Sequence, residues 1–412
     1  MTMRINQQPI RFIQATETCN EKYRSLTTEA FAERLTRFFF YAGLVLVLLN
    51  RIIDQTAVNL NLDYLAVLPL MPVALLFLIV RFIGVSLGLN LKRFFISFVL
   101  LIFSFVSYYQ CGQSYLPTAC LLLCGIGGID IRKTIKAISA CTLLLIVGLG
   151  LIQLMDWALT GDLAGSVLRS NGRLRLSFYF EHPNILGAMA LMSFMGFTVC
   201  SDNLSASDCL MGISVGFLIL FLTDSRTSCA LLFLYLLIRI LFDLYPQFIN
   251  SKLRFVVLVF PLVCEFLSML VMLQVLPDSF IVYLNRLFSG RPGYWILQYN
   301  QLGGWTMFGQ VTLYGDQFIN GWLYPSVTID CFYAATLLQL GIWSFIAFYY
   351  LYVNSIDQAF MSNDHSKFAV LFVCAIFGFT EVHMIDFSIC FPMLLLGEGL
   401  LQQLNSDDVV DF

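Results

Sequence analysis

Arginine, histidine and carboxylate side chains gather in four short stretches of an otherwise apolar sequence. The first is RLRLSFYFEHPNILG, from Arg173 to Gly187, and the second is TDSRTS, which contains Arg226. The third, NRLFSGRPGYW, contains Arg291, and the fourth joins YPSVTID, ending at Asp330, with TEVHMID further along the chain. Because only 12% of the residues are charged, these clusters are the first candidates for chemistry.

These residue types suit a reaction that releases an anion such as diphosphate. The planar guanidinium of arginine grips two phosphate oxygens at once and stabilises the negative charge that grows on a leaving group. A carboxylate or histidine takes the proton from an incoming hydroxyl, and the candidates are Asp330, Glu381 and His383. The sequence shows no metal-ligand spacing, so we expect neither a metal nor a cofactor. The pattern indicates sugar transfer from a lipid-linked diphosphate donor.

The HPN triplet in the first stretch has two interpretations. Proline is favoured in the first turn of a helix and asparagine caps helix starts, so the triplet could be only a helix entry. A helix N-terminus is also an anion-binding end, which gives His182 and Asn184 a role in holding a phosphate or sugar. Arg175 is the expected principal ligand, whereas Arg173 is expected to pair with Glu181 or to face the surface.

The composition indicates the class of protein that positions these groups. With 412 residues, 39 phenylalanines and a mean hydropathy of +0.81, the chain carries more apolar surface than a soluble core can bury. A bilayer core requires roughly 20 apolar residues per helix, and about twelve segments qualify. Their centres lie near Val45, Leu75, Leu101, Leu121, Ile146, Met189, Val215, Leu234, Leu262, Leu338, Val373 and Leu394. We therefore expect an all-α polytopic membrane protein with about twelve transmembrane helices.

The predicted spans divide the chain into five parts. The first 36 residues are polar and lack the apolar core of a signal peptide, so we expect a cytoplasmic segment. The parts are a cytoplasmic N-terminal segment (1–36), spans one to nine (37–276), a large external loop (277–330), spans ten to twelve (331–402) and a cytoplasmic tail (403–412).

The positive charges predict the orientation. With a cytoplasmic N-terminus, the predicted inside segments hold 16 of the 23 basic residues, including every lysine, as the positive-inside rule requires. Every basic residue on the predicted outer face is an arginine, which indicates an anion site there. Scattered interfacial anchors, or ion pairs with Glu181, Asp224 and Asp330, are the alternative.

The predicted external loop is far longer than an ordinary connection and rich in aromatic residues. Disordered segments are poor in aromatics, so we expect the loop to pack as a small cap. Its tryptophans are candidate flat faces for sugar rings, with an interfacial aromatic belt as the alternative. These residues are Trp295, Trp305 and Trp322.

The order of these motifs resembles the O-antigen polymerase and ligase superfamily of bacterial membrane glycosyltransferases. Similar proteins carry an arginine seven residues before HPN, as at Arg175, and then a Ser-Arg pair, as at Ser225 and Arg226, before a large external loop. The stretches RLFSGRPGYWILQYNQLGGWTMFGQ and TIDCFYAATLLQLGIW look like Wzy-type repeat-unit polymerases. The resemblance covers about Ile135 to Leu400.

The resemblance implies a role for each matching residue. Arg175, Arg226 and Arg291 would hold the diphosphate of an undecaprenyl-linked donor. The ligase branch usually has a His-Asn pair where this chain has Asp330 and Cys331, which favours a polymerase and puts Asp330 in the place of the base. Glu381 and His383 remain rivals for that role. Tyr179 stands where similar proteins commonly have a glycine before the Phe-x-His-Pro-Asn motif.

The expected function is a metal-independent glycosyltransferase that polymerises undecaprenyl-diphosphate-linked oligosaccharide repeats into capsule, exopolysaccharide or O-antigen. It would act on the outer face of the plasma (inner) membrane, with both termini cytoplasmic. Its partners would be the lipid-linked oligosaccharide, the bilayer, and flippase and chain-length regulator proteins, without nucleic acid. A ligase for finished polysaccharide and a lipid-linked sugar transporter are the alternatives; a transporter predicts charge near mid-span and inverted repeats.

Overall fold

The computed structural model consists almost entirely of helices. It describes residues 8–56, 60, 68–86, 91–161, 163, 166–168, 172–288, 290–311, 317–319, 322–324 and 329–402, with side chains from residue 31 onward except at 248, 317–319, 322–324, 399, 401 and 402. The helices in these residues are α1 (Gln8–Thr56), α2 (Leu70–Ser86), α3 (Leu91–Cys111), α4 (Tyr115–Cys124), α5 (Ile131–Thr160), α6 (Pro183–Thr198), α7 (Ala206–Leu218), α8 (Arg226–Leu244), α9 (Ser251–Met272), α10 (Asp278–Leu287), α11 (Arg291–Leu302), α12 (Phe332–Ala335), α13 (Ile342–Met361), α14 (His365–Thr380) and α15 (Leu396–Gln402). Two antiparallel strand pairs complete the elements, β1 (Val167–Leu168) with β2 (Leu174–Arg175) and β3 (Gln317–Ile319) with β4 (Trp322–Tyr324). The predicted helical class is confirmed.

Six helical segments of the described chain are long and apolar enough to cross a membrane. They are Phe31–Thr56 of α1, α3, α5, α7 with its continuation to Thr223, α8 and α9. The shorter apolar helices α2, α4, α6 and α14 have 10 to 17 residues. This set of apolar helices suggests a membrane-embedded protein, while the number of twelve spans stays a prediction.

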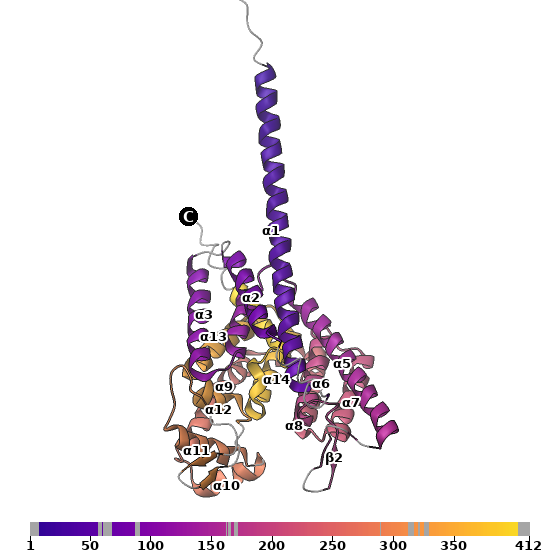
Figure 1. Cartoon of the computed structure of the whole chain (residues 1–412), viewed down its shortest axis with the longest axis vertical. Helices are drawn as coiled ribbons and strands as arrows, with labels where there is room; N and C mark the ends of the chain where they lie inside the picture. Colours follow the sequence, from indigo (N-terminus) through magenta and orange to yellow (C-terminus); the bar gives the residue numbers. More distant parts are fainter. Residues whose placement is uncertain are drawn as a thin grey trace, which may run out of the picture.

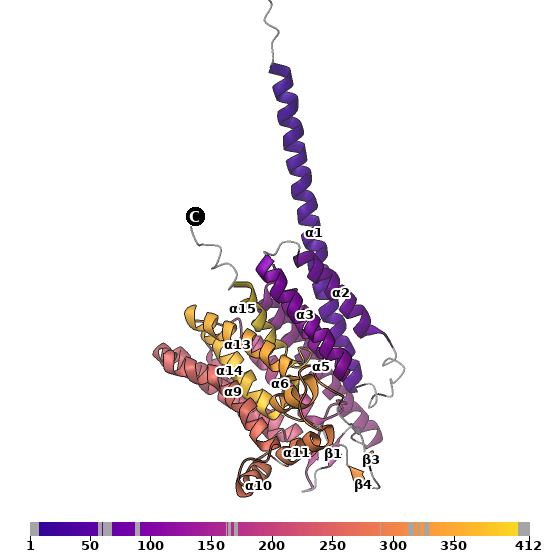
Figure 2. The ribbon, with the colours of Figure 1, turned by 90° about the vertical axis from the view of Figure 1, so that its left-hand side faces the viewer.

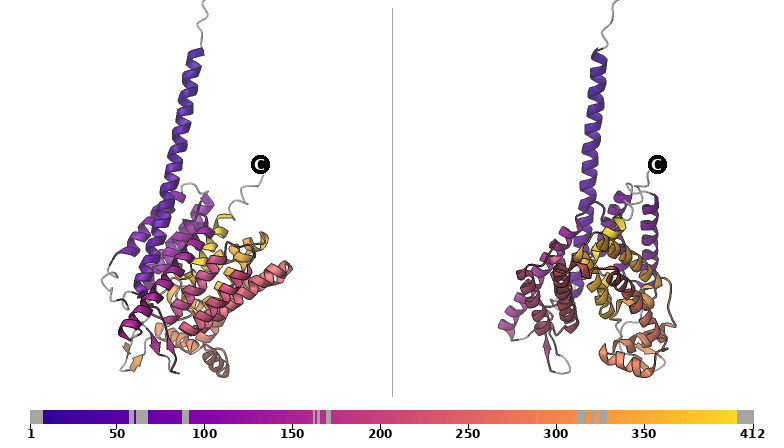
Figure 3. Two further views of the ribbon diagram at one scale, coloured as in Figure 1. Left: turned by 90° about the vertical axis from the view of Figure 1, so that its right-hand side faces the viewer. Right: turned by 180° about the vertical axis from the view of Figure 1, so that it is seen from behind.

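Helix α1 extends far beyond the rest of the molecule. Its first half stands away from the other helices and its second half packs along α2, as Figures 1 and 3 show. The buried Arg81 of α2 fixes this end of the bundle, because its Nε donates to the Gly125 carbonyl at 2.8 Å and its Nη1 to the Thr36 hydroxyl at 2.8 Å. One guanidinium thus joins α1, α2 and the end of α4.

Helices α6 and α14 occupy the middle of the bundle (Figure 2). Both are apolar around most of their circumference, and nearly all residues of α6 are buried. A helix that is hydrophobic all round must be surrounded on every side. The C-terminal segment beside them is equally buried, with Phe391, Met393, Leu394 and Leu395 all at 0% exposure.

The tenth predicted span is not one continuous helix. Helix α12 continues as a π-helical turn, Thr336–Leu340, and ends at Gly341, after which α13 begins. Gly341 has a φ of +90°, and a Cβ built on it would lie 2.3 Å from the Gly309 backbone nitrogen. The Gln310 backbone N–H donates to the Gln339 carbonyl at 3.0 Å, which holds the Gly309 backbone against the break. Only glycine therefore fits at position 341. The interruption arises from a tertiary contact that hydropathy does not reveal.

The twelfth predicted span, centred near Leu394, also differs from a regular helix. It consists of the 3₁₀ turns Val382–Ile385 and Phe391–Leu395 followed by α15. Pro392 lies in the first turn of the second of these segments, where it supplies no backbone donor. The chain therefore passes through the core as short turns.

The strands lie at one end of the molecule together with α10 and α11. Figures 1 and 2 show the β1–β2 hairpin, α10, α11 and the β3–β4 pair at the end opposite the free half of α1. The residues of the predicted external loop thus contain two helices and a strand pair, and α11 packs against α9.

Candidate functional site

Charged residues from four distant parts of the chain meet at the end that carries the hairpin and α11. Arg175 lies in β2, His182 caps α6, Arg291 begins α11, Asp330 precedes α12 and Glu381 follows α14. The sequence predicted this convergence only as a hypothesis. Below, these five residues and His383 are called the charged cluster.

Arg175 is held by two acceptors and is only 8% exposed. Its Nε donates to the Thr223 carbonyl at 2.6 Å, and its Nη2 donates to Asn184 Oδ1 at 2.5 Å. Thr223 ends the π-helical turn after α7, where carbonyls lack helical partners. The guanidinium is therefore fixed in place by both the α7 end and the α6 entry.

The HPN triplet is a helix entry, as one of the two interpretations stated. His182 occupies the N-cap position, its Nδ1 accepts from the Asn184 backbone N–H at 3.1 Å, and Pro183 occupies the first turn. Because Nδ1 accepts, the neutral ring carries its proton on Nε2, which is left to donate. Burial lowers the pKa of His182, and the Arg175 charge lowers it further, so the ring is neutral at pH 7. Asn184 acts by positioning Arg175.

Arg291 joins the two carboxylate candidates. Its Nε lies 3.4 Å from Asp330 Oδ2, its Nη2 lies 3.6 Å from Glu381 Oε1, and its Nη1 donates to the Thr380 carbonyl. The side chain is 17% exposed, so these contacts are partly shielded from water. One guanidinium thus connects α11, the chain before α12 and the end of α14.

Burial shifts the pKa values of Glu381 and His383 in opposite directions. Burial raises the pKa of Glu381 to about 8, against an opposing effect of Arg291. Glu381 is therefore mostly protonated at neutral pH and unsuited to accept a further proton there. Burial lowers the pKa of His383, whose Nδ1 lies 3.9 Å from Asp386 Oδ2. A neutral imidazole has one unprotonated ring nitrogen that can accept a proton, and the nearby Asp386 carboxylate stabilises the resulting cation.

The structure places Arg226 outside the charged cluster. Its side chain is 66% exposed, and its Nε lies 3.5 Å from Asp224 Oδ1. Arg173 is equally exposed, in agreement with the predicted alternative that it faces the surface, and it approaches the same oxygen at 3.6 Å. Asp224 has a left-handed backbone, with a φ of 47°, at the buried turn between Thr223 and α8.

The tryptophans of the predicted loop differ in position. Trp295 is 2% exposed and packs edge-on against Phe379, so both faces of its ring are covered in this conformation. Trp305 is half-buried, its Nε1 donates to the Met272 sulfur at 3.3 Å, and its ring contacts Tyr299. The side chain of Trp322 lies outside the described residues.

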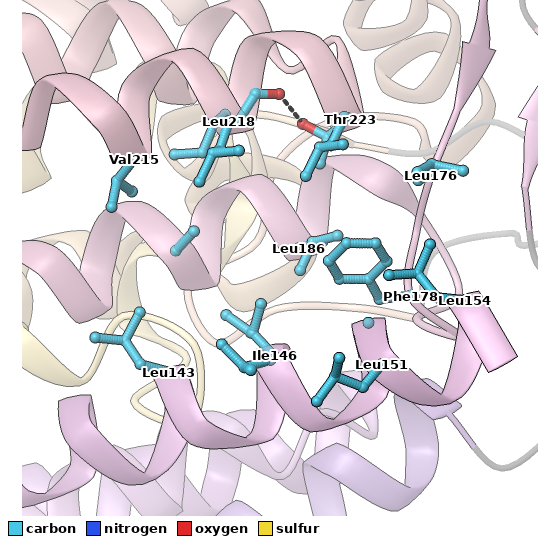
Figure 4. Close-up of a pocket in the computed structure, with 15 residues that line it drawn as sticks. Leu143, Ile146, Leu151, Leu154, Leu176, Phe178, Leu186, Val215, Leu218 and Thr223 are labelled. Carbon is cyan, nitrogen blue, oxygen red and sulfur yellow. Dashed lines mark hydrogen bonds between the residues drawn. The ribbon is translucent and has the colours of Figure 1, made fainter. Parts of the chain in front are cut away.

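An apolar groove adjoins Arg175. It has a volume of about 410 Å³ and lies between α5, α6 and the end of α7. Figure 4 shows Leu143, Ile146, Leu151 and Leu154 on one wall, facing Val215 and Leu218. The residues that line it are Leu143, Ile146, Val147, Gly150, Leu151, Leu154, Leu176, Phe178, Leu186, Ala190, Val215, Leu218, Ile219, Leu222 and Thr223. The lining thus includes Thr223, the residue whose carbonyl holds Arg175.

The sequence reasoning missed two ionisable residues. Glu265 is buried in α9, where its carboxylate accepts from the Thr336 hydroxyl at 3.0 Å in the π-helical turn after α12. A single glutamate within FPLVCEFLSML was the available signal, since ionisable groups inside apolar spans are often functional. Arg51 of α1 lies 3.3 Å from Asp386 Oδ2, a pairing that spacing could not predict.

The described residues contain no group of three or more His, Cys, Asp or Glu side chains that could hold a metal ion. They define a helical, apolar protein with a charged cluster at one end and an apolar groove beside it. Compared with known proteins, the chain matches no family model, no curated protein and no solved structure.

Proposed function

We propose that this protein is a membrane glycosyltransferase that polymerises oligosaccharide repeat units carried on an undecaprenyl diphosphate. In this proposal the chain crosses the plasma membrane about twelve times, with the charged cluster at the outer face. One observation carries the proposal: the apolar groove is lined in part by Thr223, whose carbonyl fixes the Arg175 guanidinium. A lipid diphosphate has matching chemistry, with an apolar chain joined to an anion.

The charged cluster provides the groups that such a transfer requires. Arg175 and Arg291 stabilise the charge that develops on the departing diphosphate, which is the largest electrostatic demand of the reaction. His383 or Asp330 takes the proton of the attacking hydroxyl. The new bond joins the hydroxyl oxygen to the anomeric carbon as the bond from that carbon to the diphosphate breaks, which inverts the configuration.

The proposal is tested by replacing the arginines singly and measuring the polysaccharide ladder in cells, at matched protein levels. Arg175→Ala and Arg291→Ala should each lower polymer by at least about 100-fold, the loss typical of one transition-state donor. Arg226→Ala should have a smaller effect, because that side chain is exposed and lies outside the cluster. Arg286→Ala, at an exposed position of α10, is the matched control.

The accumulated product separates the possible outcomes. Single repeat units on lipid indicate loss of polymerisation, whereas long chains left on lipid indicate a ligase. Substrate held on the inner leaflet indicates a transporter. Normal ladders from both Arg175→Ala and Arg291→Ala would refute the diphosphate clamp.

A further inference from the structure

A second cavity lies beside the charged cluster, with polar walls. Its volume is about 180 Å³, enough for about six water molecules at ~30 Å³ each. The end of α1, the start of α4 and the segment after Ile385 form it, and it shares no lining residue with the apolar groove. Its polar lining residues are Asn50, Arg51, Asp54, Gln113, Ser114, Tyr115, Thr118, Asp386 and Ser388.

The lining combines hydrogen-bond donors, acceptors and groups that can do both. Carboxylates only accept, a guanidinium only donates, and amides and hydroxyls do both. Each hydroxyl of a sugar ring also donates and accepts, so a sugar can satisfy such a mixed wall. An anion would be repelled by the two carboxylates, and an apolar ligand would leave the wall unsatisfied.

Several lining groups are already oriented. Asn50 Nδ2 donates to Asp54 Oδ2 at 2.8 Å, and the Ser388 backbone N–H donates to Asp386 Oδ1 at 3.1 Å. Arg51 Nε, although 3.3 Å from Asp386 Oδ2, has no partner with hydrogen-bond geometry among the described residues. The Nε atom itself is buried, so its contact with Asp386 holds the guanidinium at the cavity wall.

The cavity borders the charged cluster through two contacts. Asp386, which lines the cavity, lies 3.9 Å from the Nδ1 atom of His383. The Glu181 backbone N–H donates to the Gln55 carbonyl at 2.7 Å, which attaches the end of α1 to the HPN segment. His383 thus stands next to the cavity, while Arg175 stands beside the apolar groove.

We propose that this cavity binds the sugar ring of the acceptor that carries the attacking hydroxyl, an inference that rests on the proposed transferase function. The acceptor oxygen bonds to the anomeric carbon of the donor, and its proton passes to His383. The electron pair of the broken bond leaves with the lipid diphosphate.

Saturation-transfer NMR on the full-length protein in nanodiscs tests the site directly. The probes are methyl glycosides of glucose, galactose, mannose, rhamnose and N-acetylglucosamine. At least one should bind to the wild type, and Asn50→Ala and Gln113→Ala should each weaken its binding by about tenfold, the effect of one lost hydrogen bond. Ser214→Ala, on the exposed face of α7, is the matched control, and size-exclusion elution verifies folding of every variant.

The outcomes distinguish this inference from the function on which it rests. Arg175→Ala should retain glycoside binding, because its guanidinium does not line the cavity. The polysaccharide ladder of cells with Arg175→Ala tests the proposed polymerisation separately. Loss of glycoside binding in the cavity variants supports the sugar site even if Arg175→Ala gives a normal ladder. Failure of every glycoside to bind, or equal binding by the wild type and both cavity variants, would overturn it.

Discussion

Glu381→Gln is the substitution that most directly tests the electrostatics of the charged cluster. Burial raises the pKa of the wild-type carboxyl from 4.5 to about 8. Between these two pH values the carboxyl is protonated in the native state and ionised in the unfolded chain. Such a group stabilises the fold fully below pH 4.5, and this contribution is lost as the pH rises through about 8. Glutamine resembles the protonated acid in shape and has no titration.

The expected magnitude follows from the size of the shift. At 1.36 kcal/mol per unit, a shift of about 3.5 units corresponds to about 5 kcal/mol in total, of which about 2 kcal/mol is lost between pH 6 and pH 8. The wild type should therefore unfold at a lower temperature at pH 8 than at pH 6, and Glu381→Gln should lack that part of the decrease. Stability of the two proteins should be similar at pH 6.

The measurement is thermal unfolding of the purified protein in nanodiscs from pH 6 to pH 9, followed by tryptophan fluorescence. Glu181→Gln, at an exposed position of the same region, is the matched control, and its profile should follow the wild type. Glu381→Gln should also retain polymer formation at pH 7, because a protonated carboxyl is not the base. Parallel pH profiles of the wild type and Glu381→Gln, or a marked loss of stability at pH 6, would refute the reasoning.

Two further substitutions test the fold by the same unfolding measurement. Gly341→Ala should lower stability by at least about 2 kcal/mol, because φ is +90° and the new Cβ would meet the Gly309 backbone, whereas Gly148→Ala, in open helical surroundings, should be neutral or slightly stabilising. Equal effects of the two would contradict the proposed break. Glu398→Leu should lower the free energy of unfolding by about 3 kcal/mol, because it removes a carboxylate 3.1 Å from the buried Lys367 ammonium. The additional change Lys367→Leu should recover most of that loss. No recovery in the double variant would show that the ion pair is not the cause.

The helical class of the fold could be predicted from the sequence because hydropathy depends on residues that are neighbours in the chain. The apolar runs around Val45, Leu101 and Leu262 each form a long helix. The run around Leu338 was expected to do the same, but the backbone near Gly309 interrupts it at Gly341. That interruption depends on a contact between segments about thirty residues apart, which a local average cannot detect.

Part of the candidate site could also be predicted. His182 and Pro183 form the helix entry that their residue types indicate, since capping is a local interaction. The sequence singled out Arg291, Asp330 and Glu381 as separate candidates, and the structure brings each of the two carboxylates within 4 Å of the Arg291 guanidinium.

By itself, the sequence determined that the chain folds as apolar helices and that its four clusters of charged residues lie near the ends of apolar segments. Only the tertiary structure decided which of these charges meet. Arg226 matched the pattern as well as Arg291 did, yet its side chain is 66% exposed and pairs only with Asp224 among the contacts described above. Arg51 of α1 and Asp386, far apart in the chain, form a pair beside a polar cavity. Hydropathy and capping act over a few residues, whereas the partners of a guanidinium are set by the packing of distant helices.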